Sequence, residues 1–203
     1  MYTLRLQLDL CESEKRFLSK SFHYATTIQN KLVRYSKGKL ISLYSDKEYC
    51  NARLEYGKSK FSDKKVKLTA KQKDRKKYLT DLMQSKLIEY GLLKSDLETY
   101  VKPLQSKYKH YINSQQAQKL VNNVYTGIEK VLYDDGNKLH FKKYNDFDCI
   151  NQKSNTTGIQ IKNWRYITFM KHKFKIKPLK PNKKNKRKLE LISTIDLTKD
   201  VVY

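Results

Sequence analysis

One short stretch of the chain, residues 139–150, alternates aromatic rings with lysines. Lys142 and Lys143 lie between Phe141 and Tyr144. Ammonium groups neutralise phosphates without reading sequence, and aromatic rings can stack on unpaired bases. For the two lysines we favour phosphate contact, whereas the rings either contact bases or pack the edge of a small sheet. The stretch is therefore a candidate nucleic-acid-binding segment, with Lys142, Lys143 and Tyr144 as its site residues.

A cluster of amides, hydroxyls and one further cation follows this stretch. Lys153 precedes Asn155 and Thr156, whose polar groups can hydrogen-bond to base edges. Asn155 can alternatively shape the turn before Gly158. Gln118 lies near the start of a predicted helix, where a phosphate or a groove can approach, although exposed glutamines are ordinarily solvated. Lys153, Asn155, Thr156 and Gln118 complete the candidate binding set.

The acidic residues offer little for catalysis. A nuclease needs carboxylates that converge on a divalent metal, and the close pairs outside predicted helices are Asp134/Asp135 and Asp146/Asp148. The first pair is typical of a turn, and the second balances the lysines around it. No nucleophile-elbow or comparable motif is present. We therefore expect no catalytic residue, no metal site and no cofactor.

The cysteines and the amino-terminal residues indicate the cellular compartment of the protein. Cys11, Cys50 and Cys149 are far apart and odd in number, which fits neither a disulfide framework nor a metal-binding Cys-x-x-Cys pair. Residues 1–10 alternate polar and apolar side chains instead of forming the apolar block of a signal peptide. These features predict a cytoplasmic protein with reduced thiols.

The net charge identifies the leading class of partner. The 203 residues carry 44 Lys and Arg against 20 Asp and Glu, a formal charge of +24. Residues 138–188 alone hold sixteen of the basic residues and two of the acidic ones. These positive charges repel one another, and the repulsion destabilises the compact chain unless a polyanion neutralises the charge. Nucleic acid is the predicted partner, and a membrane is not, because no apolar run approaches the roughly 18 residues of a spanning helix.

Hydrophobic periodicity predicts a strand followed by a helical region. Residues 2–10 alternate, with leucines on one face, which indicates a half-buried strand. Helical spacing begins near residue 12 and runs to a predicted break at residues 36–38. Ser45 and Asp46 can cap a short second helix.

A basic run precedes the next predicted helix. Residues 58–77 hold ten Lys or Arg and two Asp, and form either a flexible loop or a solvated helix face. Thr69 can cap the helix, and Gly91 lies just past its end. Its inward side chains are predicted to be Leu79, Leu82, Met83 and Leu87.

Two more helices complete the predicted helical region. Ser95 opens the first, in which Pro103 should introduce a kink or a boundary. Ser114 opens the second, which stops at the turn signal in residues 134–137. Its apolar stripe consists of Ala117, Leu120, Val121, Val124, Ile128 and Leu132.

The last part of the chain is predicted to be β-rich and basic. Residues 159–161, 164–169 and 174–176 are short β-type runs with turn-like separators. Residues 178–188 read as a charged linker. A new extended run begins at residues 200–203, so we expect the protein to continue beyond this sequence.

The order of these segments resembles the amino-terminal half of TnpB-type transposon proteins, the compact RNA-guided DNA nucleases of insertion sequences that are related to type V CRISPR effectors. The resemblance covers essentially the whole chain, with residues 36–75 matching loosely. It is carried by the strand at residues 2–10, by Ser114-Gln-Gln-Ala-Gln-Lys-Leu120, by Leu139-His-Phe-Lys-Lys-Tyr144 and by Lys153-Ser-Asn-Thr-Thr-Gly-Ile159.

The resemblance implies an α+β fold in which a helical recognition insert interrupts a small, wedge-like β-barrel. It places residues 1–10 and 138–203 in the wedge-like domain and residues 11–137 in the insert. In the family these parts bind guide RNA and target-flanking DNA, with motif-reading contacts that fall on Gln118 and near the Asn155-Thr156 pair. The family's nuclease core and zinc ribbon lie further along and are absent here, so the resemblance implies binding without cleavage.

Two other interpretations stay open. The chain can be an enzyme whose active site no motif reveals, in which case it would cleave DNA in the presence of Mg²⁺. It can also be a non-specific RNA-binding protein with a structural role, whose affinity would be indifferent to any DNA motif. A non-specific RNA-binding protein would have a polyanionic partner, as the TnpB interpretation also requires.

Overall fold

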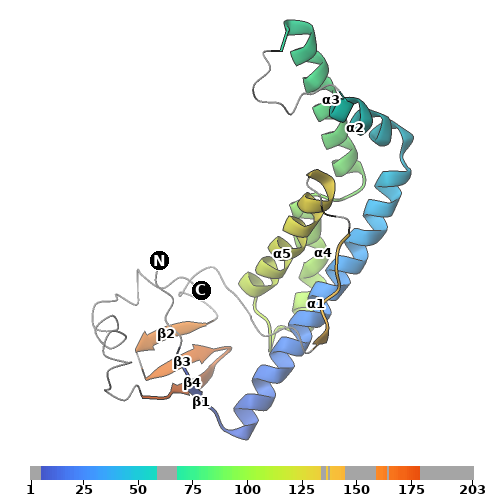
Figure 1. The fold of residues 1–203 in the computed structure, drawn as a ribbon. Coiled ribbons are helices and arrows are strands. Elements are labelled where there is room, and N and C mark those ends of the chain that lie inside the picture. Colours follow the sequence, from blue (N-terminus) through green and yellow to red (C-terminus); the bar gives the residue numbers. More distant parts are fainter. Residues whose placement is uncertain are drawn as a thin grey trace. The chain divides into compact units, whose positions relative to one another are not determined.

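The structure is a computed structural model, which describes residues 6–58, 68–133, 136, 138–144, 159–163 and 165–178. Most of these residues are helical. The helices are α1 (Glu12–Ser45), α2 (Lys47–Lys58), α3 (Ala70–Glu89), α4 (Lys94–Lys107) and α5 (Ser114–Tyr133), and the strands are β1 (Leu8–Asp9), β2 (Gln160–Asn163), β3 (Tyr166–Phe169) and β4 (His172–Ile176) (Figure 1).

The chain divides into two compact units. Unit 1 comprises Met1–Gln29, Val101–Leu120 and Lys142–Tyr203, and unit 2 comprises Asn30–Tyr100 and Val121–Phe141. The helices α1, α4 and α5 therefore contribute residues to both units. Within the described residues, none of the helices is both long enough and apolar enough to cross a membrane.

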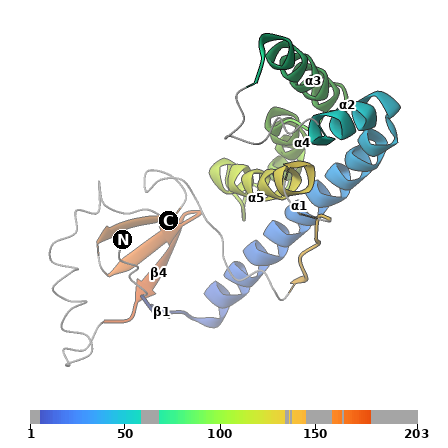
Figure 2. The ribbon, with the colours of Figure 1, turned by 45° about the horizontal axis from the view of Figure 1, so that its top comes forward.

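The predicted fold class, an α+β protein with a small β-barrel interrupted by a helical insert, is wrong. The described chain is mainly helical (Figure 2), and its strands form one open antiparallel sheet in the order β1-β4-β3-β2 (Figure 1). Closing a barrel requires the two outer strands to pair. Here β1 pairs only with β4, and β2 only with β3, among the strands that the structure describes. Alternation predicts strands, but it does not predict which strands become neighbours.

The core of unit 1 lies between one face of the sheet and the adjoining helical segments. Phe169, Phe174 and Ile176 are buried on the sheet, and Phe17 of α1 packs against the first two of these rings. The strand predicted over residues 2–10 is confirmed at Leu8 and Asp9, which pair with Ile176 and Lys175. Other buried apolar residues of unit 1 are Ala25, Ile28, Val101, Ala117 and Leu120 in helices, and Ile112 between α4 and α5.

The regular elements of unit 2 are all helices in the part that the structure describes. The Tyr44 hydroxyl of α1 donates a hydrogen bond to the Val131 carbonyl of α5 at 3.1 Å, and the ring of Tyr35 stacks on that of Tyr100 of α4. A smaller apolar cluster joins α2 to α3 through Ala52 and Leu79. The buried side chains of α5 include the six residues predicted for its stripe, Ala117, Leu120, Val121, Val124, Ile128 and Leu132, the first two of which belong to unit 1.

Helix starts were predicted better than helix interruptions. The cap at Thr69 is confirmed as a capping box with Gln72, and α5 begins at Ser114 as predicted. The predicted break near Gly38 is wrong, because α1 continues to Ser45. Pro103 likewise lies inside α4, which continues to Lys107, so no boundary forms there. Buried side chains lie on either side of Gly38, and Leu97 and Val101 are buried in the part of α4 before Pro103. Such packing stabilises a helix despite an unfavourable local residue.

Candidate nucleic-acid interface

The outward face of the sheet in unit 1 carries lysines beside an exposed tyrosine. Lys175 of β4 is opposite Asp9 of β1 on one side and opposite Tyr166 of β3 on the other. In the next row of the same face, Lys173 is opposite Thr168. Directly opposite residues of neighbouring strands project from the same side of a sheet. These five side chains therefore form one surface, which we call the lysine–tyrosine face.

The charges of the lysine–tyrosine face are accessible to a ligand. Lys173 and Lys175 are exposed, and Tyr166 is 42% exposed. The Lys175 Nζ lies 4.0 Å from the Asp9 Oδ2, with both side chains more than half exposed. An exposed pair at this distance is weak and is screened by salt. Phosphate oxygens can therefore compete with Asp9 for Lys175.

The inward face of the same sheet determines which side chains point outward. The ring of Phe17 lies 5.9 Å from that of Phe169, 6.3 Å from that of Phe174 and 3.9 Å from the imidazole of His172, measured between centroids. Phe174 is only 1% exposed. Because side chains alternate along a strand, burial of Phe174 and Ile176 forces Lys173 and Lys175 to the outside.

Several other rings of unit 1 pack against one another. Tyr111 stacks on Phe17 at 5.4 Å, and Tyr24 stacks on Tyr108 at 4.5 Å between ring centroids. Such aromatic pairs contribute about 0.5–1.5 kcal/mol each beyond the burial of their area. Much of the tyrosine and phenylalanine content of this unit thus stabilises the fold instead of offering stacking platforms.

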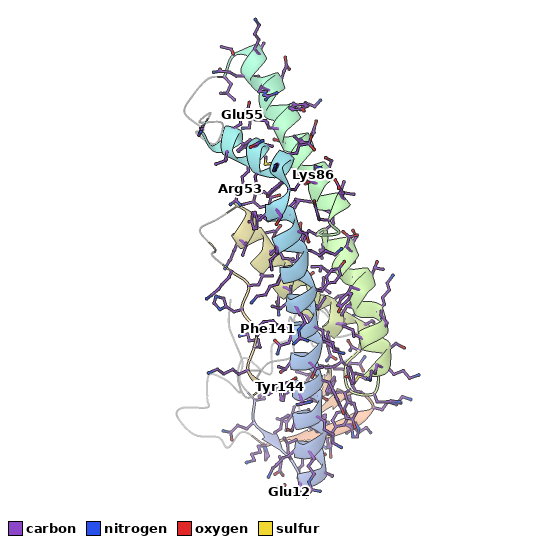
Figure 3. The ribbon with its side chains drawn as sticks, turned by 90° about the vertical axis from the view of Figure 1, so that its right-hand side faces the viewer. Glu12, Arg53, Glu55, Lys86, Phe141 and Tyr144 are labelled. Carbon is purple, nitrogen blue, oxygen red and sulfur yellow. The ribbon has the colours of Figure 1, made fainter. Side chains whose placement is uncertain are left out.

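Lys142, Lys143 and Tyr144 lie together in unit 1, on the short segment after residue 141. All three side chains are exposed, Tyr144 by 51%. The ring of Tyr144 stacks on the imidazole of His23 of α1, with centroids 4.6 Å apart and planes inclined by 20° (Figure 3). This contact holds the segment against the helix and leaves the two neighbouring lysines in solvent.

Phe141, which precedes these residues, belongs to unit 2. Its ring is 47% exposed, and the Lys37 Nζ of α1 lies 4.4 Å from the ring centroid. A cation over an aromatic face is favourable by about 0.5–1 kcal/mol at exposed sites. Phe141 therefore has a partner within its own unit.

The amides at the start of α5 include a helix cap that was not predicted. Gln118 is half-buried there. Gln116, which is 1% exposed, accepts a hydrogen bond from the Asn113 N–H through its Oε1, and its own N–H donates to the Asn113 Oδ1. This reciprocal pair caps the helix. The other predicted contacts, Lys153, Asn155 and Thr156, lie outside the described residues.

Unit 1 also has a hollow of about 310 Å³ beside the start of α1. It is lined by Arg16 and Lys20, one helical turn apart, together with the ring of Tyr111. Residues four apart on a helix share a face, so the two cations project side by side. Glu12 also lines the hollow, but its carboxylate is already engaged by Lys15 at 2.6 Å.

The two units differ sharply in charge. The described ranges of unit 1 (6–29, 101–120, 142–144, 159–163 and 165–178) contain fifteen Lys and Arg but three Asp and Glu, namely Asp9, Glu12 and Glu14. The described ranges of unit 2 contain sixteen basic and nine acidic residues. From residue 15 onward, therefore, the described part of unit 1 has no acidic residue to offset its cations.

The strongest electrostatic coupling among the described residues lies in unit 2 and is structural. The Lys86 Nζ is 3.0 Å from both the Asp46 Oδ2 and the Glu48 Oε2, and 3.2 Å from the Glu89 Oε2. Hydrogen bonds from the Tyr49 N–H and then from Lys86 lower the pKa of Asp46 to about 2. The acidic neighbours raise the pKa of Lys86. The network ties α3 to the start of α2.

The lysine–tyrosine face was missed when the sequence was read alone, although a signal for it exists. Every second residue from Lys171 to Lys177 is a lysine, and Phe174 and Ile176 lie between them. This is the period of a strand with one buried and one basic face. The strand itself was predicted, but its outward residues were not considered as a surface.

Comparisons of this chain with models of protein families, with curated proteins and with solved structures found no match. Among the described residues, no group of three or more His, Cys, Asp and Glu side chains is placed to hold a metal ion. The geometry and the charge of unit 1 are therefore the features that bear on function.

Proposed function

We propose that this protein binds nucleic acid, and that unit 1 supplies most of the contacts. The observation that carries the proposal is the charge of the described part of unit 1, fifteen basic residues against three acidic ones. Neutralising phosphates releases counterions, which drives association of such a surface with a polyanion. Lys142, Lys143, Lys173 and Lys175 are exposed and can reach phosphates.

Within this proposal, the narrower role is binding of guide RNA and target-flanking DNA in a TnpB-like protein, without catalysis. The resemblance of the sequence is its support. Non-specific RNA binding is the alternative. We also propose that the protein acts in the cytoplasm, in line with the free thiols of Cys11 and Cys50.

Fluorescence anisotropy titrations with labelled single-stranded RNA, single-stranded DNA and duplex DNA test the proposal. We expect affinity to fall steeply with salt, with a slope of log affinity against log salt of about −0.9 for each phosphate neutralised on duplex DNA. A flat response to salt would contradict the electrostatic argument. A titration with anionic lipid vesicles distinguishes a nucleic-acid surface from a general anionic one.

The narrower role requires a separate comparison. The RNA transcribed beside the gene should compete better than an unrelated RNA of equal length if the protein recognises a guide. Equal competition by both would support the non-specific alternative. Incubation of labelled DNA with Mg²⁺ tests the absence of catalysis, and cleavage that depends on this protein's own carboxylates would overturn it.

A further inference from the structure

Tyr166 occupies an unusual place on the lysine–tyrosine face. It is the first residue of β3, an inner strand that has β4 on one side and β2 on the other. Even so, 42% of the residue is exposed. Phe169 and Phe174 of the same sheet are buried on the opposite face, at 4% and 1% exposure. The sheet thus buries two rings and presents a third.

The neighbours of Tyr166 carry positive charge. Lys175 is directly opposite it on β4, and Lys173 is the next residue along β4 on the same face. Neighbouring strands are about 4.8 Å apart, so both ammonium groups can reach a ligand that lies on the tyrosine ring. Thr168, two residues along β3, adds a hydroxyl group on the same face.

A ring with ammonium groups on the neighbouring strand matches the chemistry of an unpaired nucleotide. A base offers a flat face for stacking, and its phosphates offer negative charge within reach of nearby lysines. In a duplex the base faces are covered by the neighbouring pairs, so a tyrosine on a sheet cannot stack on them without unstacking the helix. Lysines alone would not distinguish single strands from duplex, but an exposed ring beside them does.

We propose that the lysine–tyrosine face binds unpaired nucleic acid, with Tyr166 stacking on a base and with Lys173 and Lys175 binding the adjacent phosphates. This inference rests on the proposed function and specifies its ligand as single-stranded. Asp9 limits the face on the β1 side, because its carboxylate repels phosphates. The strand therefore lies over β4, β3 and the β2 side of the sheet.

The test compares Tyr166→Ala and Tyr166→Phe with the unmodified protein, using a labelled oligothymidylate and a duplex with the same number of phosphates. Loss of stacking on one base should lower single-strand affinity by roughly 5- to 150-fold in Tyr166→Ala. Duplex affinity should change by less than about twofold, because the lysines still bind its phosphates. Tyr166→Phe keeps the ring and should keep the single-strand affinity.

Two further variants define the face. Lys173→Ala with Lys175→Ala should weaken binding of both probes and reduce the salt slope by about one for each phosphate that is no longer neutralised. Asp9→Asn should strengthen binding of the single strand. Thermal melts of each variant establish that it folds, and Tyr166→Phe provides an intact ring if Tyr166→Ala unfolds.

The proposal is overturned if Tyr166→Ala binds the oligothymidylate as tightly as the unmodified protein, or if its affinity for both probes falls equally while it still folds. It is also overturned if Tyr166→Phe, which keeps the ring, loses the preference of the unmodified protein for the oligothymidylate over the duplex. Failure of the broader function looks different, because the unmodified protein would then bind neither probe in a salt-dependent way.

Discussion

At the scale of single residues, lysines and aromatic rings of unit 1 obey different constraints. Rings stack in pairs, such as Phe17 on Tyr111 and Tyr24 on Tyr108, because burial of a large apolar surface stabilises the fold. Lysines cannot be buried without a partner, and Lys142, Lys143 and Lys173 remain in solvent. Binding residues therefore collect among the cations, with Tyr166 and Tyr144 as partly exposed rings beside them.

Lys142→Ala combined with Lys143→Ala should weaken binding of nucleic acid by a similar factor for every sequence tested. Ammonium groups on phosphates position the ligand but carry no base information. Anisotropy titrations with two unrelated sequences measure the effect, and we expect the salt slope to fall by up to about two.

Lys71→Ala combined with Lys73→Ala is the matched control, since it removes two exposed charges from α3 of unit 2. Its effect on affinity should be smaller than that of the Lys142/Lys143 pair. Equal effects of the two double variants would mean that binding follows total charge instead of unit 1. A change of sequence preference in the Lys142/Lys143 variant would contradict a phosphate role.

At the scale of elements, α1 shows how packing overrides a local signal. Gly38 lies inside this 34-residue helix, is exposed, and has no atom within 4 Å of the place that a Cβ would occupy. Glycine costs about 0.5–1 kcal/mol relative to alanine inside a helix. Burial of Ser36, Leu40 and Leu43 on the opposite side keeps the helix continuous.

Gly38→Ala should therefore stabilise the protein by about 0.5–1 kcal/mol, measured as the free energy of unfolding in denaturant. Gly91→Ala is the control, because Gly91 follows α3 with a φ of +64° and its Cβ would lie 3.3 Å from the Tyr35 hydroxyl. Alanine is strained in that conformation and should destabilise. Equal changes in the free energy of unfolding for the two variants would contradict the different environments of Gly38 and Gly91.

A second prediction concerns the junction of α2 and α3. Asp46 has a folded-state pKa of about 2, below its ordinary value of 3.8, so its ionised form stabilises the folded protein. This contribution is fully present above the ordinary pKa and disappears as the pH falls through about 2. Asp46→Asn should therefore lower Tm near neutral pH, and the difference from the unmodified protein should shrink on acidification below 3.8.

Thermal melts over a pH series measure this difference. Asp81→Asn serves as the control, since it removes an exposed carboxylate from the same helix α3 that carries Lys86. A Tm difference for Asp46→Asn that stays constant with pH would mean that altered packing, not removal of the charge, causes the destabilisation.

At the scale of the whole molecule, charge opposes folding in the absence of a ligand. The chain carries a formal charge of +24, and cations of like sign repel one another. Salt screens this repulsion with a Debye length of about 10 Å at 0.1 M. A polyanion would reduce it more directly, by placing opposite charges beside the lysines.

The Tm of the free protein should therefore rise as sodium chloride is added, up to roughly 0.2 M, where screening is largely complete. Addition of oligonucleotide should raise Tm further at low salt, because a ligand that binds only the folded state stabilises it. This second gain should shrink as salt increases. A Tm gain from oligonucleotide that is independent of salt would contradict the electrostatic account.

Local patterns in the sequence determined the elements and several of their ends. The alternation before Leu10 identified a strand, the Thr69 box fixed the start of α3, and the apolar stripe of α5 was correct at each predicted position. These features depend on residues within one or two helical turns, so they can be read directly. Composition likewise established the net charge and hence the class of partner that is proposed.

Only the tertiary structure decided which segments became neighbours. The open sheet order, the continuity of α1 through Gly38 and the placement of Lys173, Lys175 and Tyr166 on one face all depend on contacts between residues far apart in the chain. A strand's period shows that it has two faces, but the partner that buries Phe174 determines which face is outside. The lysine–tyrosine face exists because Phe17 and the sheet share a core, and this contact cannot be predicted from periodicity alone.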